Sequence, residues 1–322
     1  MKALRYEDQC LSVADVDMPR AVEAGEALVR VLVSGICNTD LEIARGYSGF
    51  QGTLGHEFIG VVERAPDEAA DLIGQRVVGE INAGCGRCAL CAAGDSRHCP
   101  ERTVLGIVAR DGAHAEYLQL PAANLLPVPD DITNERAVFC EPLAAACGIM
   151  ERARIDDGMR VAVVGDGKLG LLCAQAIKAQ TGASVTLIGK HQSKLAIAAR
   201  RDIEIALLDK LPAAAPRFDV AIEASGAAAG FALALDLLRP RGTLVLKSTF
   251  HGTTNFDAAR IVVNEINVVG SRCGRFAPAL ALLQKNAVDV ESLISEEYAL
   301  ANGVQAMARA GESGVLKVLL KP

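Results

Sequence analysis

Four cysteines lie close together in the stretch GCGRCALCAAGDSRHCP, with the spacing C-x2-C-x2-C-x7-C. Thiolates at this spacing can surround one tetrahedral zinc ion, and four of them leave no position open for a substrate, so the zinc would be structural. An iron–sulfur cluster is the main alternative, because a C-x2-C-x2-C run with a later Cys-Pro resembles bacterial ferredoxins, although the last gap is longer here. The predicted structural zinc ligands are Cys85, Cys88, Cys91 and Cys99.

A second set of potential metal ligands is dispersed along the N-terminal part of the chain. Taken singly, each residue has a simpler explanation than metal binding. A lone cysteine is commonly a small core residue, and a lone histidine commonly has its hydrogen bonds made by neighbouring residues. Together the set offers soft, borderline and hard donors, a mixture that catalytic zinc accepts. We expect the segment FCEP to be extended, so its cysteine and glutamate would point to opposite faces and only one would reach a metal. The candidates are Cys37, His56, Glu57, Cys140 and Glu141.

A glycine-rich turn with the pattern Gly-x-Gly-x-x-Gly follows a predicted strand and opens a predicted helix. In that context the glycines let the backbone approach a pyrophosphate, which the helix N-terminus stabilises. An ordinary glycine turn is the alternative, and the lysine in the turn either adds charge to phosphate binding or is simply solvated. The residues predicted to bind the nucleotide here are Gly165, Gly167, Lys168, Leu169 and Gly170.

The end of the next predicted strand bears on the choice of nucleotide. NAD-binding proteins place an acidic residue there to hold the adenosine ribose. Here the position is Gly189, followed by Lys190 and His191. Without the carboxylate a 2′-phosphate is not repelled, and Lys190 could attract it, so NADP is favoured over NAD. The alternative is that Lys190 is only a surface lysine and that NAD is used. The predicted contacts are Gly189, Lys190, His191 and Lys194.

The pattern of predicted elements changes near residue 140. Before it, short alternating apolar runs punctuated by glycine and proline predict a β-rich domain with functional loops, with strands at 27–33, 58–65, 76–81 and 115–120. After it, strand, turn and helix alternate, which predicts a parallel, doubly wound sheet. The predicted helices cover 168–182, 192–202 and 227–240, and residues 314–322 contain a strand that returns to another sheet.

Composition limits the classes of protein to consider. The 322 residues are 51% hydrophobic and 22% charged, enough for two domains with sizeable cores. A net charge of -6 disfavours a general nucleic-acid binder. No apolar run is long enough to span a membrane, and the N-terminus turns polar too soon for a signal peptide. We therefore expect a cytoplasmic protein that acts on a small molecule, with its ten cysteines reduced.

The order of these motifs resembles the zinc-dependent medium-chain dehydrogenase/reductase family, which includes alcohol, sorbitol, threonine and glucose dehydrogenases. The resemblance covers nearly the whole chain and rests on GIC.TD, GHE..G.V, the four-cysteine loop, EPLA, the glycine turn and the closing LKVLL. It implies an α/β protein with a GroES-like β-rich catalytic domain in residues 1–140 plus 271–322 and a Rossmann nucleotide-binding domain in residues 141–270. It also implies a homodimer or homotetramer.

The resemblance also implies a catalytic zinc with an open position, held by Cys37, His56 and a third ligand. That ligand is a cysteine in the alcohol-dehydrogenase branch and the glutamate of an EP pair in the sorbitol and glucose branch. Aligned through the following Pro-Leu, Glu141 takes this position, directly or through water, and Cys140 falls one residue early and packs instead. Glu57 binds zinc directly in some members and supports it from behind in others, so we keep it as an exchanging or supporting ligand.

Further roles follow from the same resemblance. Thr39 would be the first hydroxyl of a proton relay, and Asp40 would hold a histidine ligand in the right tautomer. Many alcohol dehydrogenases continue the relay with a histidine where this chain has Glu42, which is either a relay group or a solvated helix residue. Lys317 matches a basic residue that reaches the pyrophosphate.

We therefore predict a zinc-dependent, NAD(P)-linked oxidoreductase that holds two zinc ions. It would interconvert an alcohol, namely a polyol, sugar or other hydroxy compound, and its carbonyl form by hydride transfer. Glu141, Glu42 and the expected NADP preference point to the polyol and sugar branch. The alternatives are a non-catalytic nucleotide-binding relative, an iron–sulfur redox protein and a dehydrogenase for a specialised biosynthetic alcohol, and the retained ligand set argues against the first of these.

Overall fold

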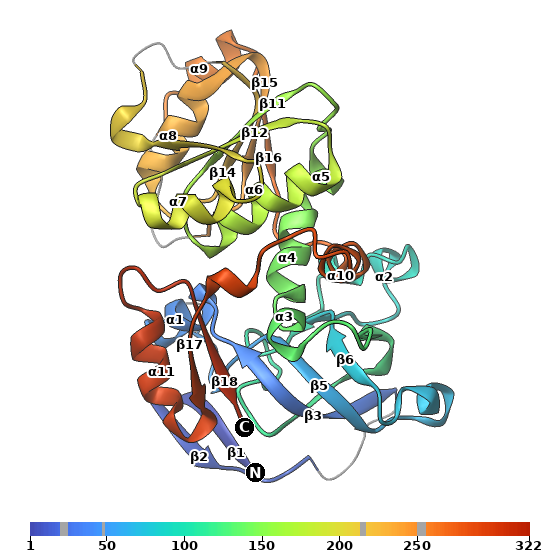
Figure 1. Cartoon of the computed structure of the whole chain (residues 1–322). Coiled ribbons are helices and arrows are strands. Elements are labelled where there is room, and N and C mark those ends of the chain that lie inside the picture. The colour runs from blue at the N-terminus through green and yellow to red at the C-terminus, as the bar shows by residue number, and fades with distance from the viewer. Residues whose placement is uncertain (20–24, 47–48, 213–216, 250–255) are drawn as a thin grey trace. The chain divides into compact units, whose positions relative to one another are not determined.

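The computed structural model describes residues 1–19, 25–46, 49–212, 217–249 and 256–322 (Figure 1). The chain folds into two compact units, of which the first combines Met1–Glu141 with Leu293–Pro322 and the second is Pro142–Ser292. The second unit is therefore an insertion in the first, which carries both termini. In the described parts of the chain, no helix combines the length and the apolar character that crossing a membrane requires.

The first unit is built around a sheet in which β3 is the central strand. β3 (Glu26–Gly35) pairs antiparallel with β5 (Glu57–Arg64), β9 (Tyr117–Pro121) and β18 (Lys317–Lys321). The C-terminal strand thus returns to the N-terminal part of the chain, which confirms the prediction for residues 314–322. The remaining strands are β1 (Lys2–Glu7), β2 (Cys10–Asp15), β4 (Gly52–Thr53), β6 (Arg76–Gly79), β7 (Asn82–Ala83), β8 (Thr103–Val104), β10 (Leu125–Pro127) and β17 (Ile294–Ala299).

The first unit also contains apolar core clusters and several short helices. Apolar residues from β3, β5 and β6, including Val29, Phe58 and Val77, form one buried cluster, and Leu4, Ile36 and Val318 belong to a second one. The α-helices are α1 (Asn38–Ala44), α2 (Ala89–Ala92), α3 (Asn134–Ala137) and α11 (Gly303–Ala310). The 3₁₀ helices of the whole chain are η2 (Asp67–Leu72), η3 (Ser96–His98), η4 (Ala122–Asn124), η5 (Leu208–Lys210), η6 (Glu291–Leu293) and η7 (Leu300–Asn302).

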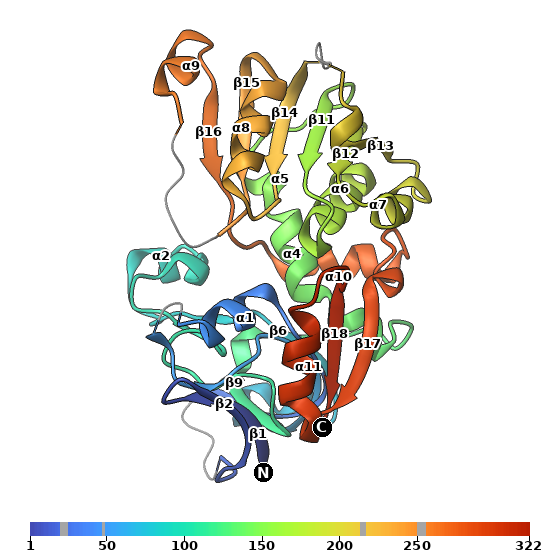
Figure 2. The ribbon, with the colours of Figure 1, turned by 90° about the vertical axis from the view of Figure 1, so that its left-hand side faces the viewer.

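The second unit contains a six-stranded sheet in the order β13-β12-β11-β14-β15-β16, and every pair is parallel (Figure 2). The strand order reverses at β11, so the predicted doubly wound sheet is confirmed. The strands are β11 (Arg160–Val164), β12 (Ser184–Gly189), β13 (Glu204–Leu207), β14 (Phe218–Glu223), β15 (Leu238–Leu246) and β16 (Asn267–Gly270). The helices are α4 (Cys140–Cys147), α5 (Ile149–Arg152), α6 (Lys168–Gln180), α7 (Gln192–Ala199), α8 (Ala228–Leu237), α9 (Ala258–Val263) and α10 (Phe276–Gln284).

One local prediction is wrong, because FCEP is not extended. Helix α4 begins at Cys140, within this segment. Pro142 lies in the first helical turn. Backbone N–H groups there have no acceptor within the helix, so a proline, which lacks this group, costs no hydrogen bond. Neighbouring side chains on a helix still point in different directions, so Cys140 and Glu141 still face different surroundings.

The chain also returns to the first unit later than the expected boundary at residue 271. The segment before Leu293 is bound to the second unit by side-chain contacts. The carbonyl oxygen of the Gln175 side chain accepts the backbone N–H of Asp289 at 2.6 Å, and Arg200 lies 2.9 Å from the hydroxyl of Ser292. These contacts explain why residues 271–292 group with the parallel sheet.

Candidate active site and metal centres

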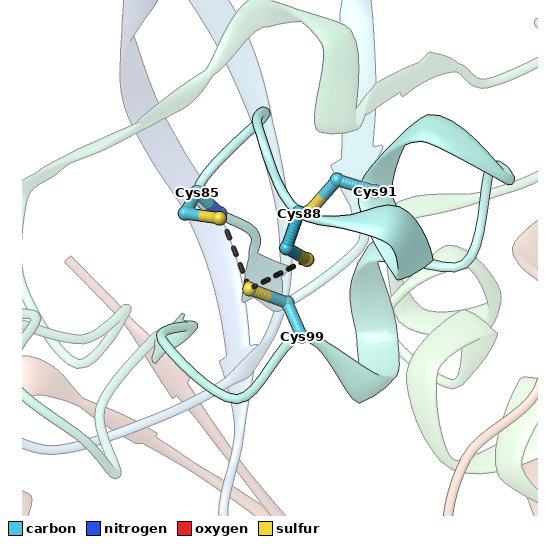
Figure 3. Close-up of side chains that lie close together, drawn as sticks. All are labelled: Cys85, Cys88, Cys91 and Cys99. Atoms are coloured by element: carbon cyan, nitrogen blue, oxygen red, sulfur yellow. Dashed lines mark hydrogen bonds between the residues drawn. The ribbon is translucent and has the colours of Figure 1, made fainter.

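The loop between β7 and β8 brings Cys85, Cys88, Cys91 and Cys99 together (Figure 3). All four sulfur atoms lie within 4.8 Å of one another. The Sγ atoms of Cys88 and Cys99 are 3.7 Å apart, and the backbone N–H of Cys85 donates to Cys99 Sγ at 3.4 Å. Four convergent sulfurs fit one closed tetrahedral site.

The environment of these thiols differs from one cysteine to another. Hydrogen bonds from the backbone N–H groups of Arg87 and Cys88 lower the pKa of the Cys85 thiol to about 7. Burial raises the pKa of Cys91 to about 11. Thiolates are the form that binds zinc, so zinc binding would release the protons of the remaining thiols to solvent.

A second cluster joins Cys37, His56 and Glu57, whose donor atoms also lie within 4.8 Å of one another. The pairing of β3 with β5 explains why these three residues lie close together. Gly35 pairs with Glu57 across β3 and β5, and Cys37 follows the end of β3. His56 is 3% exposed and Glu57 is fully buried. A partly exposed thiol, a buried imidazole and a buried carboxylate match the donor mixture of a catalytic zinc site.

Asp40 orients the first part of this cluster. Its Oδ2 accepts the backbone N–H of Cys37 at 2.8 Å, and its Oδ1 lies 3.4 Å from Nδ1 of His56. Burial raises the pKa of Asp40, but the charges and hydrogen bonds of His56 and His114 outweigh this effect and hold the pKa well below its ordinary value. The carboxylate is therefore ionised and positioned to fix the His56 ring.

Asp40 also contacts a histidine that sequence reasoning missed. Nε2 of His114 lies 3.5 Å from Asp40 Oδ2, and its Nδ1 lies 2.9 Å from the hydroxyl of Ser34. Gly55 accommodates this ring, because a Cβ there would lie 2.6 Å from His114 Cγ. A single histidine 74 residues from Asp40 carries no spacing signal, so only the fold identifies it.

Glu57 has a second buried neighbour, Lys317. Oε2 of Glu57 pairs with the Lys317 ammonium, which also donates to the Ile36 carbonyl oxygen at 3.2 Å. Burial lowers the pKa of Lys317, but Glu57 and Cys37 raise it more, so the lysine stays charged. The other oxygen, Oε1, has no hydrogen-bond partner in the described chain. Lys317 is 1% exposed, and the pyrophosphate contact that the resemblance implied for it stays a prediction.

Glu141 lies at the first turn of α4, near this cluster but outside the group of donors within 4.8 Å. Desolvation is the main reason that its pKa rises, to about 7, with smaller contributions from Glu57 and Glu80 and opposition from His56 and Lys317. A carboxyl group poised near neutrality can ionise when a cation arrives. Cys140, one residue earlier, is fully buried.

The two predicted relay residues lie on α1. Thr39 Oγ1 is 3.9 Å from Cys37 Sγ, so its hydroxyl is beside the cluster. Glu42 accepts a hydrogen bond from Arg45 at 2.7 Å, in an ion pair within the same helix. The structure therefore places Thr39 at the site and Glu42 in a surface ion pair one turn further on.

The glycine turn of the second unit has the geometry expected of a phosphate-binding loop. Gly165 has a φ of 120°, and Gly167 is the N-cap of α6, with open space around the position of a Cβ. A Cβ at Gly170 would collide with the carbonyl oxygen of Gly165. Lys168 and Leu169 form the first turn of α6. A helix N-terminus with open space before it suits a pyrophosphate.

Beside this turn, β12 ends at Gly189, followed by exposed Lys190 and His191 and by partly exposed Lys194. The structure adds Asp166, which sequence reasoning passed over. Its carboxylate accepts the backbone N–H groups of Lys190 and His191 at 2.7 and 2.6 Å. The pairing of Val164 with Ile188 explains this contact, because it places the residues after β11 beside those after β12.

Comparison with known proteins matches both parts of the chain. Residues 23–130 match the family model described as alcohol dehydrogenase GroES-like domain, and residues 169–285 match the model described as zinc-binding dehydrogenase. Sorbitol dehydrogenase from Halalkalibacterium halodurans is 29% identical over 313 residues, which cover 91% of this chain and 91% of that protein.

Solved structures with a bound nucleotide are among those similar over the whole chain. One is a zinc-binding dehydrogenase from Sinorhizobium meliloti 1021 bound to NADP, with 28% identity and a TM-score of 0.88, covering 100% of this chain and 99% of the other. The second is described as a short chain alcohol dehydrogenase from E. coli CFT073 in complex with NADH. It has 25% identity, a TM-score of 0.91 and the same coverage.

Proposed function

The chain belongs to the zinc-dependent medium-chain dehydrogenases, NAD(P)-linked oxidoreductases of alcohols, and from this premise we propose that it oxidises a polyol, sugar or related hydroxy compound, and reduces its carbonyl form, at a zinc site on the first unit. The observation that carries the proposal is the convergence of Cys37, His56 and Glu57 at the ends of β3 and β5. A partly exposed thiol, a buried imidazole and a buried carboxylate oxygen without a hydrogen-bond partner are together the kind of donors that a catalytic zinc site uses.

Cys37, His56 and Glu141 are the proposed zinc ligands, and Glu57 exchanges with them or supports them through its unpaired Oε1. Zinc held there would polarise the oxygen of a bound alcohol or carbonyl, while a nicotinamide would accept or donate the hydride. Asp40 keeps the His56 ring in place. The Thr39 hydroxyl, 3.9 Å from Cys37 Sγ, is the first group to take the alcohol proton, and Glu42 is the candidate to pass it on.

The four-cysteine cluster is proposed to hold a second, structural zinc. Its sulfurs satisfy a tetrahedral ion without leaving a position for substrate, and the loop that carries them has little apolar core of its own. Two zinc ions per chain are therefore expected. The expected homodimer or homotetramer and the expected cytoplasmic location stay predictions.

The nucleotide is proposed to bind at the glycine turn, with NADP preferred over NAD. Three features support the preference. Residue 189 itself is a glycine without an acidic side chain, exposed Lys190 follows it, and Lys194 lies one helical turn further. Exposed His191 is a further proposed contact at the same place. A higher kcat/KM with NAD than with NADP would contradict this part of the proposal.

The polyol and sugar class rests on the glutamate in FCEP and on the sorbitol dehydrogenase relative. The test is a panel of simple alcohols, polyols and aldoses, each offered with NAD and with NADP while nicotinamide absorbance is followed. The proposal expects turnover concentrated among polyols or sugars. Turnover of simple alcohols alone would reject the substrate class, and no turnover of any compound would favour a nucleotide-binding relative without catalysis.

A further inference from the structure

The end of β12 lacks an acidic side chain, but a carboxylate from another segment fills the same space. A Cβ atom added to Gly189 would lie 2.6 Å from both Cγ and Oδ2 of Asp166. No side chain fits at position 189 while Asp166 keeps its place. An acidic side chain at position 189 and the carboxylate of Asp166 would therefore occupy the same space, so only one of them can be present.

The segment after β12 holds Asp166 in this position. Two backbone N–H groups, those of Lys190 and His191, donate to Oδ2, and Nδ1 of the His191 ring lies 3.0 Å from the same oxygen. The residue is 8% exposed. Burial raises the pKa of Asp166, but the hydrogen bonds from His191 and Lys190 outweigh that effect, so the pKa lies below its ordinary value. Asp166 is ionised at neutral pH.

We propose that Asp166 discriminates between the two nucleotides by supplying, from the glycine turn, the negative charge that the strand end lacks. The inference rests on the proposed function, because it requires a dinucleotide at this turn. The adenosine ribose of such a nucleotide lies at the end of the second strand, where a carboxylate accepts hydrogen bonds from the ribose hydroxyls and repels a 2′-phosphate. Lys190 favours NADP, and the charge of Asp166 limits this preference. NAD therefore remains usable.

A simpler explanation is that Asp166 only fastens the chain between β12 and α7. Asp166→Asn separates the two, since an asparagine oxygen still accepts the same N–H groups while the charge is lost. The second unit offers a matched control in Asp157. Its Oδ1 accepts the backbone N–H of Gly182 at 2.8 Å, and a Cβ at Gly182 would lie 2.6 Å from that oxygen. Asp157 precedes β11, at the end of the strand opposite to the glycine turn.

The experiment measures dissociation constants by calorimetry on the zinc-loaded full-length protein. Adenosine 2′,5′-bisphosphate and adenosine 5′-monophosphate probe the ribose end alone, and NADP and NAD probe the whole site. For Asp166→Asn we expect the affinity ratio of the 2′-phosphorylated to the unphosphorylated ligand to rise about tenfold, the effect of one like-charge contact of about 1.4 kcal/mol. Asp157→Asn should leave the ratio unchanged.

A ratio that moves less than about twofold in Asp166→Asn, or equally in both variants, overturns the inference while the proposed function stands. Failure of the wild-type protein to bind any of the four ligands overturns the proposed function itself, and the inference with it. The two results are distinguishable because the first requires measurable binding.

A double variant covers the case in which Asp166→Asn does not fold. Combining Asp166→Gly with Gly189→Asp moves the carboxylate back to the strand end and clears the space that the Asp166 side chain fills. We expect a wild-type ratio. A ratio about tenfold higher, despite the restored carboxylate, would overturn the inference.

Discussion

Lys317 and Glu57 lie 260 residues apart in the sequence and form a buried ion pair beside Cys37 and His56. β18 delivers the lysine and β5 delivers the glutamate, and both strands pair with β3. The C-terminal strand therefore supplies charge to a site whose other members come from the first 141 residues.

Removal of the lysine should leave the carboxylate of Glu57 buried without a counter-charge. We expect Lys317→Met to lower the free energy of unfolding by about 3–5 kcal/mol, measured by urea denaturation. Lys321→Met is the matched control, since Lys321 is 41% exposed and pairs with Glu135 and Glu297 at the surface. Its loss should cost about 0–1 kcal/mol. Equal losses would show that the buried pair does not stabilise this unit.

The raised pKa of Glu141 predicts a pH dependence in the metal-free protein. Folding favours the protonated carboxyl group, because its pKa rises from 4.5 to about 7. The contribution of Glu141 to the free energy of unfolding is therefore complete below pH 4.5 and is lost as the pH rises through 7. The loss is at most about 3 kcal/mol. Glu141→Gln should remove this component. The measurement is urea denaturation of both metal-free proteins at pH 5 and pH 8, and an identical pH response of the two would contradict the prediction.

Zinc retention can test which residue of FCEP, Cys140 or Glu141, is the zinc ligand. Glu141→Ala should lose one zinc ion more readily than the wild-type protein and lose most of its activity, because it removes a proposed ligand. Cys140→Ser should do far less, since Cys140 is buried one residue away at a different angle on α4. Metal content after dialysis measures both. The reverse order would transfer the ligand role to the cysteine and remove one argument for a polyol substrate.

The four-cysteine cluster should hold its zinc independently of the catalytic site. Cys91→Ser removes one of four sulfurs, so we expect one zinc ion per chain instead of two and a lower thermal midpoint. Cys10→Ser, at an exposed position outside both clusters, is the control and should retain two. A Cys91→Ser protein with two tightly bound zinc ions would contradict the assignment, and a brown wild-type protein that absorbs visible light would indicate an iron–sulfur cluster instead.

Local patterns were enough to predict much of this architecture. The strand that ends at Gly189 and the helix from Lys168 follow from apolar periodicity and glycine placement, and the four cysteines are close enough in sequence to come together within one loop. The segment FCEP was predicted wrongly, although its proline is compatible with the first turn of a helix.

The missed residues depend on contacts between distant segments. His114 reaches Asp40 only because β3 and its neighbours bring their loops together, and no spacing rule links the two. Asp166 was visible in the glycine turn, but its meaning depends on the register of β11 against β12, which places it over Gly189. The residue at position 189 alone therefore does not reveal that a carboxylate lies at this strand end.

The central claim is that zinc at the Cys37–His56 site is required for nicotinamide-linked oxidation of a polyol or sugar. The most direct measurement follows zinc content and turnover together while the wild-type protein is titrated with a chelator and then resupplied with zinc. We predict two zinc ions per chain at the start, loss of turnover as the more labile ion leaves, and recovery when it returns. Undiminished turnover with one zinc removed from the Cys37–His56 site would contradict the account.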